Sequence, residues 1–225
     1  MSREVDDVAI VAHELQAPVA AIRAAARTLA GADLADAALR GRLLQVILDG
    51  ADELGHLVDD LLTAARLDAG AVGIVLERCD AVEIAAQAIA VAGQASEARR
   101  QPQLAAGPGP VYVLADRRRL RQVATNLLTN ALGHGRGIVT VAVEAVGDRV
   151  QISVADEGPG IPDADCERVF DRYARLPGGS VRGTGLGLAI ARELTETMGG
   201  TILAERGRAR GARLVVELPA ASDPG

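Results

Sequence analysis

Two runs of apolar residues at heptad spacing lie in the first seventy residues, and they constrain the fold of this chain more than any other feature. Their members alternate at intervals of four and three residues, which is typical of helices that pack along a seam. The first run is Val8, Ala12, Leu15, Val19, Ile22, Ala26 and Leu29, and the second is Leu43, Ile47, Gly50, Leu54, Leu57, Leu61 and Ala64. Gly31 predicts the end of the first helix, so residues 32–37 would connect an α-helical hairpin.

Further apolar residues broaden the second seam, namely Leu44, Val58 and Leu62. Two helices with apolar faces of this width cannot cover each other fully. We therefore expect a homodimer in which two hairpins form a four-helix bundle. The alternative is a hairpin that packs on the rest of its own chain.

A small-residue segment, 68–73, predicts a domain boundary, with one domain at 1–70 and a second at 71–225. The second domain mixes helices and strands without regular alternation. This favours an α/β two-layer sandwich with the helices on one face of the sheet. The expected elements are strands at 74–76, 111–114, 138–145, 150–155, 202–205 and 214–218, helices at 80–98, 116–132 and 186–198, and loops at 101–110 and 156–183.

Composition excludes several classes of function. All 24 basic side chains are arginines, so a P-loop, a Ser/Thr-type protein kinase and a Schiff-base enzyme all lack their lysine. The net charge of −6 argues against a nucleic-acid partner. Cys79 and Cys166 have neither disulfide nor zinc spacing. No apolar run reaches the ~20 residues of a membrane span, and we expect a cytoplasmic location.

Polar residues on two of the expected helices could carry chemistry. His13 lies beside the first seam, where its imidazole could act as a nucleophile while Glu14 accepts a hydrogen bond from the other ring nitrogen. An ordinary solvated face is the alternative. Asn126 and Asn130 are four residues apart, so both amides project from one helix face and need a partner there. Capping or bridging water is the alternative for this pair.

Two glycine-rich segments complete the candidate site. Asp156 to Gly160 ends a strand and opens a loop, but its carboxylate spacing does not fit a calcium loop. The segment Gly183-Thr184-Gly185-Leu186-Gly187 runs into a helix, whose free amides suit an anion. It does not follow a strand, so it is a poor dinucleotide-binding fingerprint.

In order and spacing, these segments resemble the sequence boxes of bacterial two-component sensor histidine kinases. The five matching segments are the H-box at 12–18, the N-box at 126–131, the G1 box at 156–161, the F-box at 169–173 and the G2 box at 183–188. The resemblance implies a dimerisation and histidine-phosphotransfer hairpin followed by an ATP-binding domain of the Bergerat type. ATP and Mg²⁺ would be its cofactors.

The resemblance also implies residue roles. Asp156 would accept the adenine amino group, and Asn130 would ligate Mg²⁺. Asn126 stands where hydrolysing relatives carry a glutamate base, so ATP would be held intact. Arg175 corresponds to a lid arginine near the γ-phosphate. The glycines that would frame the lid are Gly158, Gly160, Gly183, Gly185 and Gly187, with Thr184 and Leu186 in the same binding segment.

The implied function is autophosphorylation of His13 from Mg-ATP and transfer of the phosphoryl group to an aspartate of a response-regulator receiver domain. Gly133 stands where the family usually has a lysine, and His134 follows it, so the alternative is a degraded kinase that serves as a nucleotide-binding, phospho-accepting scaffold. Ala17 replaces the usual Thr or Asn. Because twelve residues precede His13, we expect the catalytic core of a larger sensor, which would be its cytoplasmic portion, or input from another protein.

Overall fold

The computed structural model describes residues 2–31, 36–95, 101–174, 184–207 and 211–222. It divides into two compact units. The first comprises Met1–Arg66 with Arg182–Thr184, and the second comprises Leu67–Val181 with Gly185–Gly225. Among the described helices, none has the length and apolar character that crossing a membrane requires.

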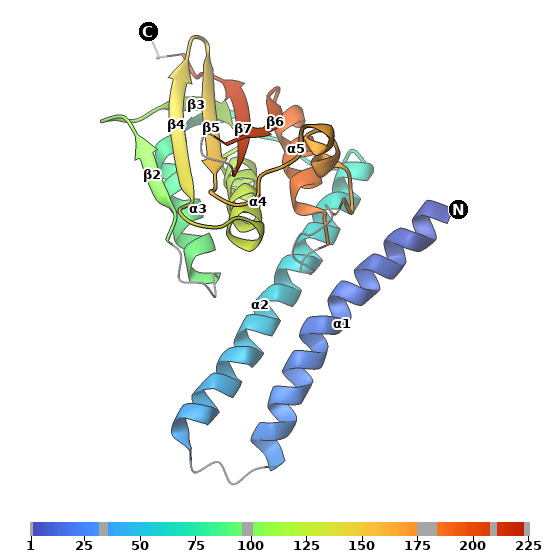
Figure 1. Ribbon diagram of the computed structural model, residues 1–225. Helices are drawn as coiled ribbons and strands as arrows, with labels where there is room; N and C mark the ends of the chain where they lie inside the picture. The colour runs from blue at the N-terminus through green and yellow to red at the C-terminus, as the bar shows by residue number, and fades with distance from the viewer. Residues whose placement is uncertain (1, 32–35, 96–100, 175–183, 208–210, 223–225) are drawn as a thin grey trace. The chain divides into compact units, whose positions relative to one another are not determined.

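The first unit contains the predicted helical hairpin, built from α1 (Ser2–Gly31) and α2 (Ala37–Asp68) (Figure 1). The second heptad seam is confirmed, because Gly50, Leu57 and Ala64 are buried on α2. Gly50 permits a close approach: a β-carbon there would lie 2.8 Å from Cγ1 of Ile22. The glycine in the seam therefore allows the two helices to pack closely.

On α1, the buried face coincides only partly with the predicted seam, of which Leu15, Ile22 and Leu29 are half-buried. Pro18 and Ala25 are buried, whereas Ala12, Val19 and Ala26 of the predicted seam are exposed. The close contact of Gly50 with Ile22 and with the carbonyl of Pro18 accounts for the difference, since it fixes which side of α1 meets α2. Apolar side chains remain exposed on both helices, namely Val19, Leu44, Val46, Leu48, Val58 and Leu62.

The second unit is built on a five-stranded sheet with the order β2-β4-β5-β7-β6. Its strands are β2 (Gln103–Ala106), β4 (Thr140–Val146), β5 (Arg149–Ala155), β6 (Thr201–Arg206) and β7 (Ala212–Pro219). β2 is parallel to β4, and the other neighbouring pairs are antiparallel. A separate two-stranded sheet pairs β1 (Glu77–Asp80) with β3 (Tyr112–Ala115).

Three helices form the second layer: α3 (Ala81–Ala95), α4 (Arg117–His134) and α5 (Gly187–Thr197). α4 packs between α3 and α5, and all three contact the large sheet, where Figure 1 shows them on one face. Leu127 and Leu128 of α4 are fully buried against this sheet-and-helix core, as is Ile190 of α5. The two-layer sandwich predicted from the sequence is confirmed. Two short 3₁₀ helices, Asp163–Asp165 and Arg168–Phe170, follow β5.

Two expected elements differ in the structure. The strand expected at 74–76 lies at Glu77–Asp80 instead, because the amide of Val75 donates to the side chain of Asp116, 3.0 Å away, rather than to a neighbouring strand. The loop expected at 101–110 contains β2, an exposed edge strand that forms only by parallel pairing with β4. Such a long-range partner leaves no local signal in the sequence.

Candidate functional site

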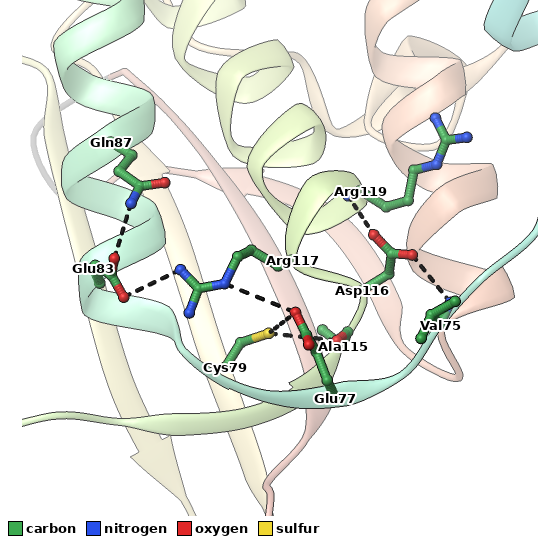
Figure 2. Close-up of polar contacts among 9 residues, drawn as sticks. All are labelled: Val75, Glu77, Cys79, Glu83, Gln87, Ala115, Asp116, Arg117 and Arg119. Atoms are coloured by element: carbon green, nitrogen blue, oxygen red, sulfur yellow. Dashed lines mark hydrogen bonds and ion pairs between the residues drawn. The ribbon is translucent and has the colours of Figure 1, made fainter.

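A network of polar side chains fixes the start of α4, the helix that carries both candidate asparagines (Figure 2). Asp116 is the N-cap of α4, since its carboxylate accepts from the amide of Arg119 at 3.0 Å. Its second oxygen accepts from the amide of Val75, also at 3.0 Å. Burial raises the pKa of Asp116, but the amides of Val75, Arg119 and Arg118 outweigh this effect and leave the pKa lowered.

The next residue of α4 connects it to two other elements. Arg117 lies 3.2 Å from the carboxylate of Glu83 on α3 and 3.8 Å from that of Glu77 on β1. Figure 2 shows Glu83 also accepting from Gln87, one turn further along α3. These partners are well exposed, so each pair adds little stability, but together they restrict the direction in which α4 leaves β3.

Asn126 joins α4 to the glycine-rich segment of the G2 box. Its side-chain amide donates a 2.8 Å hydrogen bond to the carbonyl oxygen of Gly187, the first residue of α5. Asn130 lies one turn later on α4, and both side chains are half-buried. The structure thus brings the N-box and the G2 box together, with the two amides on one helix face as predicted.

Asp156 lies at the end of β5, against the C-terminal end of α4. Its Oδ1 accepts a 2.6 Å hydrogen bond from the amide of Gly158, and its own amide donates to the carbonyl of Ala212 at 3.0 Å. A β-carbon at Gly135 would lie 2.6 Å from Cβ of Asp156, so only a glycine permits this approach. Burial lowers the pKa of His134, and the nearby charge of Asp156 opposes that shift.

Two F-box residues, Phe170 and Arg172, pack against or pair with other parts of the second unit. Phe170, the single phenylalanine, is buried. Arg172 pairs with both carboxylate oxygens of Glu193 on α5, at 2.8 and 3.0 Å, and with Asp68 at 2.7 Å. The hydrogen bond from Arg172 lowers the pKa of Asp68.

The next residue brings the F-box against the G2 box. Tyr173 has a φ of 62°, in the left-handed region, and its amide donates to the carbonyl of Gly185 at 3.0 Å. Gly185 has a φ of 70°, and a β-carbon there would lie 2.8 Å from Cα of Tyr173. Two residues with backbone conformations that side chains disfavour therefore meet just before α5. The family resemblance implies a lid at this point.

The remaining candidates divide between the units. Leu186 and Thr184 are buried, and Gly160 has a φ of 81°, which favours glycine. Arg175 and Gly183 lie outside the described residues.

In the helical unit, the side chain of His13 is exposed, whereas that of Glu14 is buried. The two neighbouring side chains therefore leave α1 in different directions.

These contacts define what the second unit can bind. A carboxylate enclosed by glycine backbone suits a nitrogenous base with an amino group, and the start of α5 offers backbone amides to phosphate. Among the described residues, no group of three or more His, Cys, Asp or Glu side chains could hold a metal ion alone. Asn130 fits a divalent cation that is shared with phosphates. The fold and the site thus define a class of protein in which an α/β domain with a site suited to a nucleotide is joined to a helical hairpin.

Comparison with protein families leads to the particular family. The "His Kinase A (phospho-acceptor) domain" matches residues 8–70. The "Histidine kinase-, DNA gyrase B-, and HSP90-like ATPase" domain matches residues 115–222. The chain belongs to the two-component sensor histidine kinases.

Curated relatives agree with this assignment. Sensor protein KdpD of Mycobacterium tuberculosis is 34% identical over 223 residues, covering 95% of this chain and 26% of the relative. Sensor histidine kinase WalK of Bacillus subtilis is 31% identical over 219 residues, covering 94% of this chain and 36% of the relative. The chain therefore spans between a quarter and two fifths of the length of these two proteins.

Solved structures are similar over most of the chain. Full-length ShkA in complex with AMPPNP has a TM-score of 0.68 at 31% identity, over 84% of this chain and 40% of that one. Histidine kinase AdeS of Acinetobacter baumannii has a TM-score of 0.64 at 26% identity, over 93% of this chain and 98% of that one.

Two residues at this site were not identified from the sequence. Gly135 and Gly211 both lie against Asp156, yet neither belongs to a glycine-rich box quoted above. The signal in the sequence was weak: Gly135 ends α4, an ordinary position for glycine, and Gly211 follows an arginine-rich stretch of the sequence and precedes β7. Their contacts with Asp156 arise only from the tertiary fold.

Proposed function

We propose that this chain is an ATP-dependent protein-histidine kinase that phosphorylates His13 and passes the phosphoryl group to an aspartate of a response-regulator receiver domain. The observation that carries the proposal is the enclosure of Asp156 by glycine backbone, in a domain where Asn126 also bonds to Gly187 and in a chain whose other domain exposes His13. We assign residues 1–70 to dimerisation and phosphotransfer, and residues 71–225 to nucleotide binding.

The nucleotide-binding domain would hold Mg-ATP through a small set of groups. Asp156 accepts the adenine amino group, and Asn130 ligates Mg²⁺, which neutralises phosphate charge when bound. Thr184, Leu186 and the boxed glycines 158, 160, 183, 185 and 187 frame the segment that covers the nucleotide. The AMPPNP complex of ShkA supports the nucleotide assignment.

The chemical step would use the residues of α1. One ring nitrogen of His13 donates its lone pair to the γ-phosphorus, and the bond from that phosphorus to the bridging oxygen of ADP breaks. Glu14 would accept the proton of the other ring nitrogen, which keeps the attacking nitrogen unprotonated. The burial of Glu14 in the structure means that this role requires its carboxylate to turn toward His13. Arg175 would stabilise charge on the transferred group.

A homodimer follows from the surface of the hairpin. Val19, Leu48 and Leu62 are between 40% and 58% exposed, on both helices. A second hairpin would bury these side chains in a four-helix bundle.

A second candidate rests on Gly133. It lies on the exposed end of α4, where a β-carbon would meet nothing within 4 Å, so the usual family lysine is missing from an open position. A chain without this cation could bind nucleotide and accept a phosphoryl group without catalysing its own transfer. The glycine at position 133 is thus the observation that favours the second candidate, a degraded kinase that acts as a scaffold.

Nucleotide titration and a transfer assay distinguish the two candidates. For the kinase, Asp156→Asn should weaken Mg-ATP binding by about 1–3 kcal/mol, because the charge and one of the two acceptor oxygens of a half-buried carboxylate are lost. Asn130→Ala should instead remove the magnesium dependence of binding. The wild-type chain should transfer label from ATP to a receiver domain. Binding without any transfer would favour the scaffold, and unchanged Mg-ATP binding in both variants would contradict the proposed site.

A further inference from the structure

Three glycines surround Asp156, and they come from three different parts of the second unit. Gly135 follows α4, Gly158 follows β5 and Gly211 precedes β7. Gly135 and Gly158 also pack on each other, since a β-carbon at Gly158 would lie 3.0 Å from Cα of Gly135. The carboxylate therefore lies between backbone segments that the fold brings together from distant sequence positions.

The space around Asp156 admits no additional side chain. A β-carbon at Gly135 would lie 2.6 Å from Cβ and 2.7 Å from Cγ of Asp156. One at Gly211 would overlap the carbonyl oxygen of Asp156 and lie 2.9 Å from Oδ1. Real β-carbons do not approach other atoms so closely, so any larger residue at either position must displace Asp156 or its neighbours.

The direction of the carboxylate is fixed as well as its position. The amide of Gly158 occupies Oδ1, and the backbone amide of Asp156 is held by the carbonyl of Ala212, next to Gly211. Oδ2 accepts no hydrogen bond from the part of the chain that the structure describes, so we expect it to receive the ligand donor. A hydrogen bond depends steeply on distance and angle, so a small displacement of this group would weaken recognition.

We propose that Gly135 and Gly211 are positioning residues that set selectivity for the 6-amino group of adenine, because they confine Asp156 between the end of α4 and the start of β7. The inference rests on the proposed nucleotide site, and it assigns to these two glycines a function in recognition. Gly133 provides the matched control. It lies two residues before Gly135, and a β-carbon there would meet nothing within 4 Å.

The test compares two nucleotides, each titrated with magnesium: ADP, and purine riboside 5′-diphosphate, which lacks the 6-amino group. The wild-type chain should bind ADP about tenfold or more tightly than the purine nucleotide, as expected for a hydrogen bond to a carboxylate. Gly135→Ala and Gly211→Ala should each bring this ratio close to one. Gly133→Ala should keep the wild-type ratio.

The ratio separates positioning from general damage. If both affinities fell together and the ratio stayed at the wild-type value, the glycines would be purely structural and the inference would be wrong. If the wild-type chain bound neither nucleotide, the proposed nucleotide site would fail and the inference with it. If Gly135→Ala and Gly211→Ala kept the wild-type ratio while Asp156→Asn lost it, the inference about the glycines would be wrong. The proposed nucleotide site would still stand.

Asp156→Glu decides the question if the glycine variants do not fold. Glutamate keeps the charge and the acceptor, but its additional methylene moves the carboxylate away from the position that Asp156 holds between Gly135 and Gly211. The ADP preference should then fall as far as it does in Asp156→Asn. Retention of the preference by Asp156→Glu would show that the carboxylate is not confined, and would overturn the inference.

Discussion

The side-chain amide of Asn126 donates a hydrogen bond of 2.8 Å to the carbonyl oxygen of Gly187. The two residues are 61 positions apart in the sequence, and their hydrogen bond joins the middle of α4 to the first residue of α5. The side chain therefore has a structural role in addition to its proposed place in the nucleotide site.

Substitution of Asn126 by aspartate should destabilise the second unit. The carboxylate has no proton to donate at neutral pH, and it would face the carbonyl oxygen of Gly187. We expect a loss of about 1–3 kcal/mol in the free energy of unfolding, measured by chemical denaturation without nucleotide. Asn130→Asp, one turn later on the same helix, is the control. An equal loss in both variants would show that the hydrogen bond to Gly187 is not the cause.

Arg172 should not be replaceable by lysine. It contacts both oxygens of Glu193, and a single ammonium group cannot reproduce this paired geometry. We expect Arg172→Lys to lower the free energy of unfolding by about 1 kcal/mol, a modest value because the pair is partly exposed. Arg168→Ala, which removes a 69% exposed side chain paired with Asp165, should have almost no effect. Wild-type stability in Arg172→Lys would contradict this reading.

The same network predicts a pH dependence. Arg172 lowers the pKa of Asp68 below its usual value of 3.8. The stability that this pair contributes should therefore be complete above that pH and be lost as the pH falls through the lowered pKa. Asp68→Asn should remove this component from the acid limb of a stability curve. A curve identical to that of the wild-type chain would contradict the assignment.

Asp60 on α2 should give a pH dependence of opposite sign. Its pKa is raised to about 6, chiefly by burial. The charge of His56 opposes this shift, and the charge of Asp59 adds to it. Because the folded chain binds this proton more tightly than the unfolded chain, stability should fall as the pH rises from about 4 to about 6. Asp60→Asn should be nearly neutral at pH 4 and stabilising by at most about 3 kcal/mol at pH 7.

Thermal unfolding of the full chain across this pH range measures the effect of Asp60. The control is Asp52→Asn, on the same helix at an exposed position. Equal stabilisation by both substitutions would point to the overall negative charge rather than to the burial of Asp60.

Residue spacing predicted the hairpin and the helix-on-sheet architecture well, because periodicity and capping are local properties. The helix at 116–132 and the strands at 138–145 and 150–155 were predicted correctly for this reason. β2 was missed because its four residues are all exposed and it exists only through its pairing with β4. The packing face of α1 depended on a contact between Gly50 and Ile22, which no single-helix pattern contains.

Gly133→Lys should strengthen nucleotide binding. A lysine at this exposed position should add about 0.5–1 kcal/mol of helix stability, and the proposed site would gain a cation near the phosphates. Gly133→Ala separates the two effects, since it gives the helix gain without the charge. If both variants bound Mg-ATP equally, the added lysine would make no contact with the phosphates that another cation does not already supply.

Ala17 should limit removal of phosphate from the regulator. It is exposed one turn after His13, and its methyl group cannot orient a water molecule. We expect Ala17→Thr to accelerate loss of aspartyl phosphate from the regulator by about 10²-fold or more, with little change in His13 labelling. The measurement is decay of the phosphorylated regulator with each variant and ADP. Rapid decay with the wild-type chain would show that another residue, such as Gln16, positions the water.

His13 is the proposed acceptor of the γ-phosphoryl group of ATP, and labelling of the chain with γ-labelled ATP and magnesium measures this transfer. The wild-type chain should acquire label that is lost in acid and retained in base, as expected for phosphohistidine. His13→Ala should acquire none while binding Mg-ATP with wild-type affinity, because the acceptor and the nucleotide site lie on separate domains. Label that persists in His13→Ala would contradict the account.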